Sequence, residues 1–293
     1  MKICYVNKRF SKKSKEIIQH ADQIIVNYQG QGLRLTLRQL YYRFVAAGLI
    51  PNTERNYKQL GSIINDARLA GMLDWEAIED RSRNIISIPH WTNPGEIIIA
   101  AANGYSIDKW IDQEYYVEVW VEKQALESVV SDACRSLDIT CFACKGYVSQ
   151  SEMWRAAMRI RSKHKHSVII HLGDHDPSGI DMTRDIQDRL SIFCADVEVR
   201  RIALNMNQIE QYNPPPNPAK ITDTRFAAYS QEHGDESWEL DALEPSVLKN
   251  LIQTEIRSLM NEDRFNARME IQIMDKARLL ELSNEWELNE ENT

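Results

Sequence analysis

Between residues 106 and 212, stretches with the period of a β-strand alternate with stretches that have the period of a helix. This alternation limits the folds open to the chain more than any other feature. Strands are expected at Tyr116–Val121, Ile139–Ala143, Ser167–Leu172 and Val197–Leu204. Helical patterns fill the intervals, at 122–137, 150–164 and 178–193. Strand–helix–strand units build parallel sheets with helices on both faces, so we expect an α/β fold with a mostly parallel sheet.

The alternating region lies between two regions of different character. Residues 1–105 have helical patterns with short breaks. The segment Asn213–Pro218 is rich in proline and cannot continue a helix or a central strand, so it is typical of a linker. The residues after it are acidic and mostly helical in pattern. The sequence therefore predicts three regions, 1–105, 106–212 and 213–293.

The negative charge of the chain is concentrated near its C-terminus. The net charge is −8, with 43 acidic and 35 basic residues. Residues 231–293 hold 16 acids and 6 bases, a balance of −10, which leaves 27 acids and 29 bases, or +2, in the first 230 residues. Overall acidity therefore does not exclude a nucleic-acid partner for those residues.

Two further features concern the environment of the protein. The sequence has no apolar run long enough for a membrane span, and its first residues have no apolar signal-peptide core. The 5 cysteines are scattered and odd in number, which indicates a reducing compartment. We expect a cytoplasmic protein without a membrane partner, associated with the nucleoid if the source is bacterial.

Three carboxylates follow predicted strands. Glu122 comes directly after the first strand, and Asp174 and Asp176 come after the third. The carboxyl ends of parallel strands meet at one edge of a sheet, where chemistry usually collects. Unpaired carboxylates that meet there need a proton or a cation, and Mg²⁺ prefers such hard oxygen ligands. The alternative is that Asp174 and Asp176 only form a turn and cap the next helix.

These acids lie in motifs that resemble a known family. The motifs are Val121-Glu-Lys-Gln-Ala125, Lys145-Gly-Tyr147 and Gly173-Asp-His-Asp-Pro-Ser-Gly-Ile180. In this order they resemble the Toprim domain of topoisomerase VI A subunits and their meiotic double-strand-break relatives. The resemblance implies a Toprim metal-binding domain at 106–212, in which Glu122, Asp174 and Asp176 hold Mg²⁺. Lys145, in the second motif, is a candidate contact for DNA.

Enzymes of this family need a nucleophilic tyrosine on a winged-helix domain. The residues from Thr36 to Gly48 predict a capped helix whose apolar face includes Tyr41, whereas Tyr42 falls outside that face, one turn from Arg38. A guanidinium there lowers the cost of ionising a tyrosine and can bind phosphate. Arg38-x-x-Tyr-Tyr42 also resembles the pattern around the family's catalytic tyrosine, which implies catalytic roles for Tyr42 and Arg38. The alternative is that both rings pack in a core.

A second helix is predicted from Thr53 to Ala70, and a short connection joins it to the first. This arrangement fits a helix-turn-helix, with Lys58 and Arg68 as candidate DNA contacts. Asp74–Ile88 is expected to form the wing. The resemblance thus implies a winged-helix domain at 1–105.

Together these residues predict a Mg²⁺-dependent enzyme that cleaves double-stranded DNA through a 5′-phosphotyrosine intermediate. The family pairs the tyrosine of one subunit with the Toprim metal of the other, which implies a homodimer. Family topoisomerases use a separate ATPase subunit, and this sequence has no Gly-x-x-x-x-Gly-Lys-Ser/Thr motif of its own. Two alternatives stay open: a Toprim-type nuclease with a water nucleophile, and a non-catalytic DNA-binding module. Glu239 and Asp241 are expected to begin a surface helix, with metal contact as the alternative.

Overall fold

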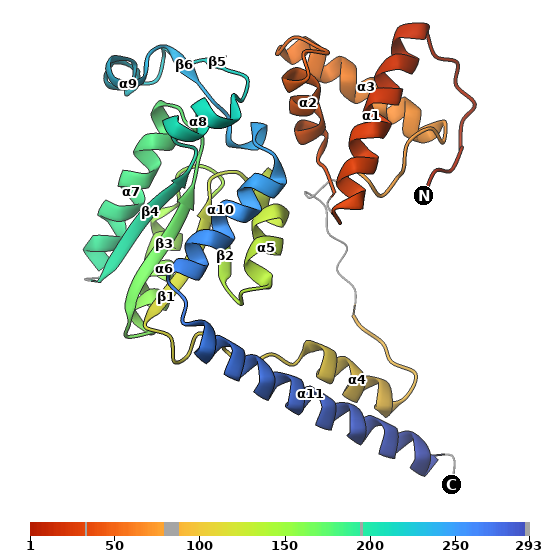
Figure 1. Ribbon diagram of the computed structural model, residues 1–293, viewed down its shortest axis with the longest axis vertical. Coiled ribbons are helices and arrows are strands. Elements are labelled where there is room, and N and C mark those ends of the chain that lie inside the picture. Colours follow the sequence, from red (N-terminus) through yellow and green to blue (C-terminus); the bar gives the residue numbers. More distant parts are fainter. Residues whose placement is uncertain (33, 79–87, 194–195, 291–293) are drawn as a thin grey trace.

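The computed structural model describes residues 1–32, 34–78, 88–193 and 196–290. Its chain forms an N-terminal helical unit, a parallel sheet between helices, and a pair of helices that extends beyond the sheet (Figure 1). The N-terminal unit contains α1 (Lys12–Gly30), α2 (Leu37–Ala46) and α3 (Glu54–Leu69). Both expected helix starts are confirmed, because Thr36 caps α2 and Thr53 caps α3. The expected wing, Asp74–Ile88, falls largely on residues 79–87, which lie outside the described residues.

The sheet confirms the predicted alternation. Its strands are β1 (Tyr115–Val121), β2 (Thr140–Ala143), β3 (His166–Leu172) and β4 (Val197–Ala203). They are all parallel, in the order β2-β1-β3-β4. The chain leaves β1 first toward β2 and later returns to β3 on the other side. This reversal of direction between β1 and β3 is the place where open parallel sheets usually bind ligands.

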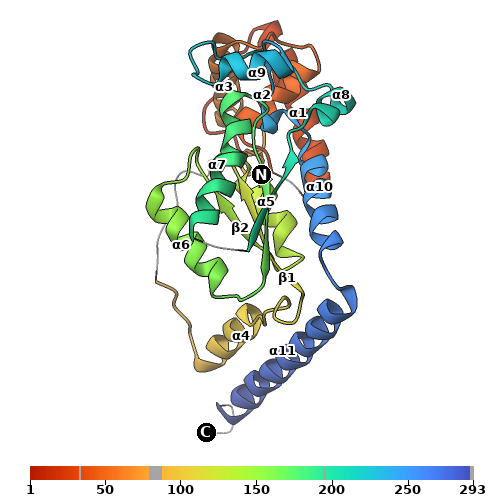
Figure 2. The same cartoon turned by 90° about the vertical axis from the view of Figure 1, so that its left-hand side faces the viewer.

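Helices cover both faces of the sheet, as the strand patterns require (Figures 1 and 2). Val117, Val119 and Val121 face one side, where α5 (Glu127–Arg135) and α10 (Pro245–Ser258) complete a hydrophobic core. Trp120 faces the other side, with α6 (Gln150–Arg161) and α7 (Pro177–Phe193). Successive side chains of a strand point to opposite faces, so two apolar cores share one sheet.

The core of the sheet continues into the acidic C-terminal region. Leu248, Ile252 and Ile256 of α10 are buried in the same cluster as the valines of β1. Residue 212, where the sequence predicts a boundary, is therefore not a break in this core. Between that residue and α10 lie short elements: α8 (Met206–Tyr212), the β5–β6 pair (Asn217–Pro218 with Glu236–Ser237), α9 (Phe226–His233) and the 3₁₀ turn η2 (Leu240–Ala242).

Two helices lie side by side at the far end of the sheet. They are α4 (Pro94–Gly104) and α11 (Glu262–Glu290), which we call the arm (Figures 1 and 2). The helix α11 continues the chain from α10 and carries the C-terminal residues away from the sheet. None of the helices in the described part of the chain is both long and apolar enough to cross a bilayer.

A charged residue of β1 is fully buried beneath α6. Glu118 is 0% exposed and binds Arg159, whose Nε and Nη2 donate to its two oxygens at 2.7 and 2.9 Å. The indole of Trp120 and the hydroxyl of Tyr116 also donate to it, at 2.8 and 2.6 Å. Burial of a carboxylate is tolerated when its oxygens are satisfied in this way. Arg159 thus has an internal partner.

Loss of this partner should destabilise the sheet. Replacing Arg159 with alanine leaves the Glu118 charge buried without a counter-ion, and we expect the free energy of unfolding to fall by about 3 kcal/mol. Urea denaturation followed by circular dichroism measures the change. Arg155→Ala is the matched control, because Arg155 lies on the same helix in an exposed pair with Glu152. A loss below about 1 kcal/mol for Arg159→Ala would contradict the expected role of this pair.

Candidate functional site

The three predicted carboxylates lie at the same edge of the sheet. Glu122 follows β1, and Asp174 and Asp176 follow β3, its parallel neighbour. The ladder continues one step past the strands, where the Glu122 amide donates to the carbonyl of Leu172 at 2.9 Å. The side chain of Glu122 then accepts a hydrogen bond from the Asp174 amide at 2.9 Å. The sheet register thus fixes Glu122 against the loop that carries the two aspartates.

Glycine permits this close approach at two positions. A Cβ added to Gly173 or Gly179 would lie 3.0 or 3.1 Å from Oε2 of Glu122. At Gly179 it would also overlap the carbonyl oxygen of Asp174. Any larger residue would therefore push the loop away from the Glu122 carboxylate.

Each of the three carboxylates already has a partner within the chain. Asp174 is 2.8 Å from the Lys123 ammonium through Oδ2, and its Oδ1 accepts from the Leu240 amide at 2.8 Å. Asp176 accepts from the Gly179 amide at 2.6 Å and so caps the start of α7. This contact matches the capping interpretation that the sequence left open for Asp176. The hydrogen bond from the Gly179 amide uses only one of the two oxygens of the Asp176 carboxylate.

Burial makes Asp174 and Glu122 reluctant to ionise. It raises the pKa of Asp174 to about 8, against the lowering effect of Lys123, and the negative charges of Glu122, Glu239 and Asp241 raise it further. Burial also raises the pKa of Glu122, and the Asp176 charge adds to this effect. The edge therefore holds more buried negative charge than its neighbours compensate.

The carboxylate oxygens of Glu122, Asp174 and Asp176 are of the type that Mg²⁺ prefers, but they are not arranged here as a metal-binding site. Within the described ranges, no group of three His, Cys, Asp or Glu side chains is placed to hold a metal ion. Asp174, which is 7% exposed, uses one oxygen for Lys123 and the other for a backbone amide. A divalent ion bound by Glu122, Asp174 and Asp176 would have to displace Lys123 from Asp174. The excess of buried negative charge would favour that exchange.

Arg201 of β4 shapes the loops that carry the acids. Its Nη2 donates to the carbonyls of Gly173, Asp174 and Leu204 at 3.0, 2.6 and 3.1 Å. Its Nη1 donates to the carbonyl of Gly179 at 2.9 Å. Burial lowers the pKa of Arg201 to about 10, although the three carboxylates act in the opposite direction. Arg201 does not belong to any of the sequence motifs. Its position near the end of the fourth strand was the only sequence feature that could have indicated a contact with these loops.

A segment of the C-terminal region reaches the same edge. His175 and Trp238 exchange two backbone hydrogen bonds, each 2.9 Å long. They bring Glu239 and Asp241 beside Lys123, which contacts Glu239 and lies 3.2 Å from Asp241. The side chain of Asp241 is 0% exposed. The sequence prediction that these acids begin a surface helix is wrong, because His175, in the loop after β3, supplies a backbone partner that holds the segment inward.

The same two acids bind the N-terminal helix α2. Arg38 lies 2.8 Å from Glu239 and 2.9 Å from Asp241. Arg43 pairs with Glu244 and donates to the carbonyl of Ala242. We call the ion cluster of Arg38, Lys123, Asp174, Glu239 and Asp241 the bridging cluster. It joins four segments that are far apart in the sequence.

Tyr42 is buried, in contrast to the expectation that it is presented. Both Tyr41 and Tyr42 are 4% exposed and belong to the N-terminal core, which also includes Ala242. Ala242, 200 positions later in the chain, belongs to the segment that covers this side of α2. Arg38 lies over the Tyr42 ring, 5.7 Å from its centroid.

The surroundings of Tyr42 oppose ionisation. Burial and the charges of Asp241 and Glu239 raise its pKa to about 12, and outweigh the lowering effects of Arg38 and Lys123. The sequence correctly identifies Arg38 as a group that favours the phenolate. The sequence does not indicate Glu239 and Asp241, whose negative charges oppose the effect of Arg38 on the pKa of Tyr42.

Several of the predicted residues meet at one cavity. A hollow of about 300 Å³ is lined by Arg38, Glu122, Lys123, Gln124, Ala125, Lys145 and Gly146. Lys145 is exposed there, in a left-handed conformation with φ of 57°. The cavity thus brings together cations from α2 and from the ends of β1 and β2, beside the carboxylate of Glu122.

The other two candidate DNA contacts have different surroundings. Lys58 is exposed on α3 and pairs with Glu54 one turn earlier, at 2.7 Å. Arg68 stacks on Trp75, 4.6 Å from the ring centroid, and donates to the Trp75 carbonyl at 2.7 Å. Arg68 therefore holds the chain that follows α3, whereas Lys58 lies at the surface.

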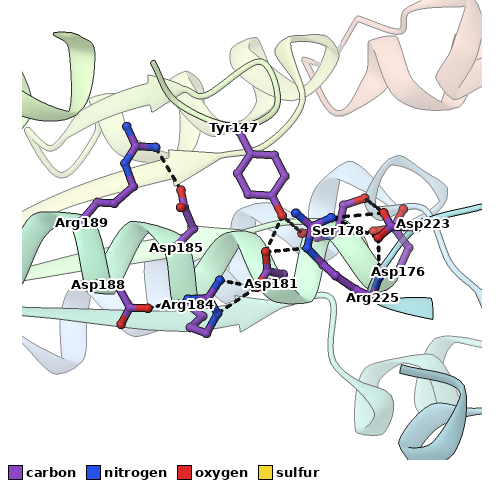
Figure 3. A network of polar contacts seen from close by, with 11 residues as sticks. Tyr147, Asp176, Ser178, Asp181, Arg184, Asp185, Asp188, Arg189, Asp223 and Arg225 are labelled. Carbon is purple, nitrogen blue, oxygen red and sulfur yellow. Dashed lines mark hydrogen bonds and ion pairs between the residues drawn. The ribbon is translucent and has the colours of Figure 1, made fainter. Parts of the chain in front are cut away.

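A polar network extends from the acid edge along α7 (Figure 3). The hydroxyl of Tyr147 donates to Asp181 at 2.7 Å, and Arg225 donates to the same carboxylate at 2.7 Å. Arg225 also contacts Asp223, which accepts from the Ser178 hydroxyl at 3.2 Å. These contacts tie the Lys145-Gly-Tyr147 loop and residues 223–225 to the first turns of α7.

No protein-family model matches this chain, and no curated protein sequence matches it. An interpretation of its function therefore depends on the geometry above.

The bridging cluster predicts how the N-terminal unit is held. Arg38→Ala removes one of the two cations that face buried Asp241, so we expect a loss of about 1–2 kcal/mol in stability. Amide hydrogen exchange should become faster at residues 238–243 and in α2. The exposed Arg55 of α3 offers the control Arg55→Ala, with a change below about 0.5 kcal/mol. Unchanged exchange at residues 238–243 would show that Arg38 does not hold this segment.

Proposed function

We propose that this chain is a Mg²⁺-dependent enzyme that cleaves double-stranded DNA and resembles a topoisomerase VI A subunit. The observation that carries the proposal is the cavity at the carboxyl edge of the sheet, which joins Arg38, Glu122, Lys123 and Lys145 beside Tyr42. Cations there suit a phosphate, and the neighbouring acids suit a divalent ion. The helices α1–α3 would serve as a winged-helix unit, and the sheet as a Toprim-type domain.

Each residue has a defined role in this proposal. The proton of the Tyr42 hydroxyl passes to solvent water and the phenolate attacks the phosphorus. The bond from phosphorus to the 3′-oxygen breaks, that oxygen takes up a proton from water and leaves as a 3′-hydroxyl, and a 5′-phosphotyrosine forms. Arg38 binds the phosphate under attack, and Lys145 contacts the DNA backbone. Glu122, Asp174 and Asp176 would hold Mg²⁺, which supplies charge stabilisation near the 3′ side. The proposal also includes two protein partners. A second copy of this chain would form a homodimer, and a separate ATPase subunit would be needed only for strand passage.

DNA would have to replace internal partners of these groups. Glu239 and Asp241 occupy Arg38 and Lys123, and Tyr42 is 4% exposed. A phosphate that binds Arg38 and Lys123 must therefore displace both carboxylates. Their departure would also remove two charges that raise the pKa of Tyr42.

The burial of Tyr42 favours a second candidate, a Toprim-type nuclease that hydrolyses DNA. With its pKa raised to about 12, Tyr42 is a poor nucleophile as it stands. In the second candidate, water activated at the acid edge attacks the phosphate, and Tyr42 packs in the core. The carboxylates are needed in both candidates, whereas the Tyr42 hydroxyl is needed only in the first.

Tyrosine variants separate these candidates. We incubate the protein with supercoiled DNA and Mg²⁺ and measure both covalent protein–DNA adducts and DNA breaks. Tyr42→Phe should abolish adducts and cleavage, by at least about 1,000-fold, because the nucleophile is lost. Tyr41→Phe is the matched control, since the Tyr41 hydroxyl binds Asn52 and Thr53 rather than the site.

The other outcomes distinguish the alternatives. Breaks without adducts that survive Tyr42→Phe and vanish in Asp174→Ala would support hydrolysis and contradict the covalent role. DNA binding without Mg²⁺, with no breaks in any condition, would contradict both and support a non-catalytic DNA-binding module.

A further inference from the structure

The two cysteines of the Cys-x-x-Cys sequence, Cys141 and Cys144, do not face one another. In an extended chain, residues three positions apart point to opposite faces of the sheet. Cys144 accordingly belongs to the core formed with α6 and α7, which also contains Trp120. Cys141 packs against the other core, which contains Val119 and a third cysteine, Cys134. The fold therefore separates the two cysteines of the motif.

Cys134 is the cysteine that Cys141 meets. The register of the parallel pair sets Cys141 of β2 beside Val119 of β1, on the face of the sheet that α5 covers (Figure 1). The helix α5 turns Cys134 toward that face, where it is 1% exposed. The thiol of Cys134 donates a hydrogen bond to the sulfur of Cys141. The two sulfur atoms are thus neighbours across the contact between α5 and β2.

The two thiols differ in their access to solvent. The strand β2 comes first in the order β2-β1-β3-β4, so Cys141 lies on an outer strand of the sheet. Cys141 is half-buried, whereas Cys134 is enclosed by the core. A small molecule from solvent can therefore reach Cys141, and Cys134 lies behind it.

The surroundings of Cys141 favour its reactive form. The hydrogen bond from Cys134 lowers the pKa of the Cys141 thiol to about 7, and the Ser131 hydroxyl acts in the same direction, against burial and the charge of Glu127. The same hydrogen bond, together with burial, raises the pKa of Cys134. A thiolate is the form of cysteine that attacks oxidants and other electrophiles. Cys141 is thus suited to attack, and Cys134 to remain a thiol until it is needed.

We propose that Cys141 and Cys134 form a redox site, in which a hydroperoxide oxidises the pair to a disulfide. The Cys141 thiolate attacks one oxygen of the peroxide, the O–O bond breaks, and a sulfenic acid forms, while the hydroxide released takes up a proton and becomes water. The Cys134 sulfur then attacks the Cys141 sulfur, the S–O bond breaks, and hydroxide leaves with the Cys134 proton as water. The two thiols lose two electrons in total, and hydrogen peroxide is reduced to two molecules of water.

The site agrees with the reducing compartment that the sequence predicts. Disulfides in such compartments are usually transient and serve catalysis or the sensing of oxidants. The bond would join α5 to β2 once the sulfur atoms approach to about 2.0 Å. It uses none of the residues of the proposed function, so the inference does not depend on DNA cleavage.

Peptide mapping of the full chain tests the proposal. Trypsin cleaves after Arg135, so Cys134 and Cys141 fall in separate peptides, 124–135 and 136–145, whereas Cys144 shares the second peptide. The reduced protein is treated with excess hydrogen peroxide, remaining thiols are blocked with N-ethylmaleimide, and the peptides are identified by mass spectrometry. We expect the two peptides to be linked and the free thiols to fall from 5 to 5 − 2 = 3. Dithiothreitol should reverse both changes.

Substitutions assign a role to each thiol. Cys134→Ser keeps a hydroxyl donor beside Cys141 but removes the second sulfur, so the link should be lost and the Cys141 sulfenic acid should persist and react with dimedone. In Cys141→Ser, Cys134 should stay reduced. Cys144→Ser is the matched control and should form the link at the wild-type rate, because Cys144 faces the other core. Circular dichroism checks that each variant is folded.

Several results would overturn the proposal. One is a folded chain that keeps all its thiols under conditions that oxidise the same chain unfolded in guanidinium chloride. Another is a disulfide within peptide 136–145, which would pair Cys141 with Cys144 instead. A link that joins two chains on a non-reducing gel, or one that Cys144→Ser abolishes, would contradict the assignment as well.

Discussion

The assembly of this protein depends on the ion pairs around Lys123. Its ammonium lies 2.8 Å from Asp174 and 3.2 Å from Asp241, and it also contacts Glu239. The same two C-terminal acids bind Arg38 of α2. Because Lys123, Asp174 and Asp241 are largely removed from water, loss of one charge leaves its partner poorly compensated. The cluster therefore fixes the N-terminal helices, the carboxyl edge of the sheet and the segment before α10 in one arrangement.

The acid edge and the bridging cluster share Asp174, so the two cannot change independently. Any cation that binds Asp174 competes with Lys123, and any phosphate that binds Arg38 competes with Glu239 and Asp241. Arg201 keeps the loop backbone in place through its carbonyl contacts, whichever partner Asp174 has. The fold thus combines a rigid backbone with side chains that have alternative charged partners.

The sheet and the acid edge could be predicted from the sequence because they depend on local patterns. The two-residue period predicts strands, and parallel order then places the residues after β1 and β3 together. The burial of Tyr42 could not be predicted in this way, because the segment that covers it lies some 200 positions later. The roles of Glu239 and Asp241 were missed for the same reason. Helical periodicity describes one helix and says nothing of the segment that packs against it.

The sequence separation of the bridging cluster has a consequence for synthesis of the chain on the ribosome. Arg38 and Lys123 leave the ribosome long before Glu239 and Asp241, which lie 201 and 118 positions after their respective partners. During that interval the helices α1–α3 and the first strands can form their local structure, while the two cations face water. The arrangement around Tyr42 therefore becomes complete only after residues 239–242 have been synthesised.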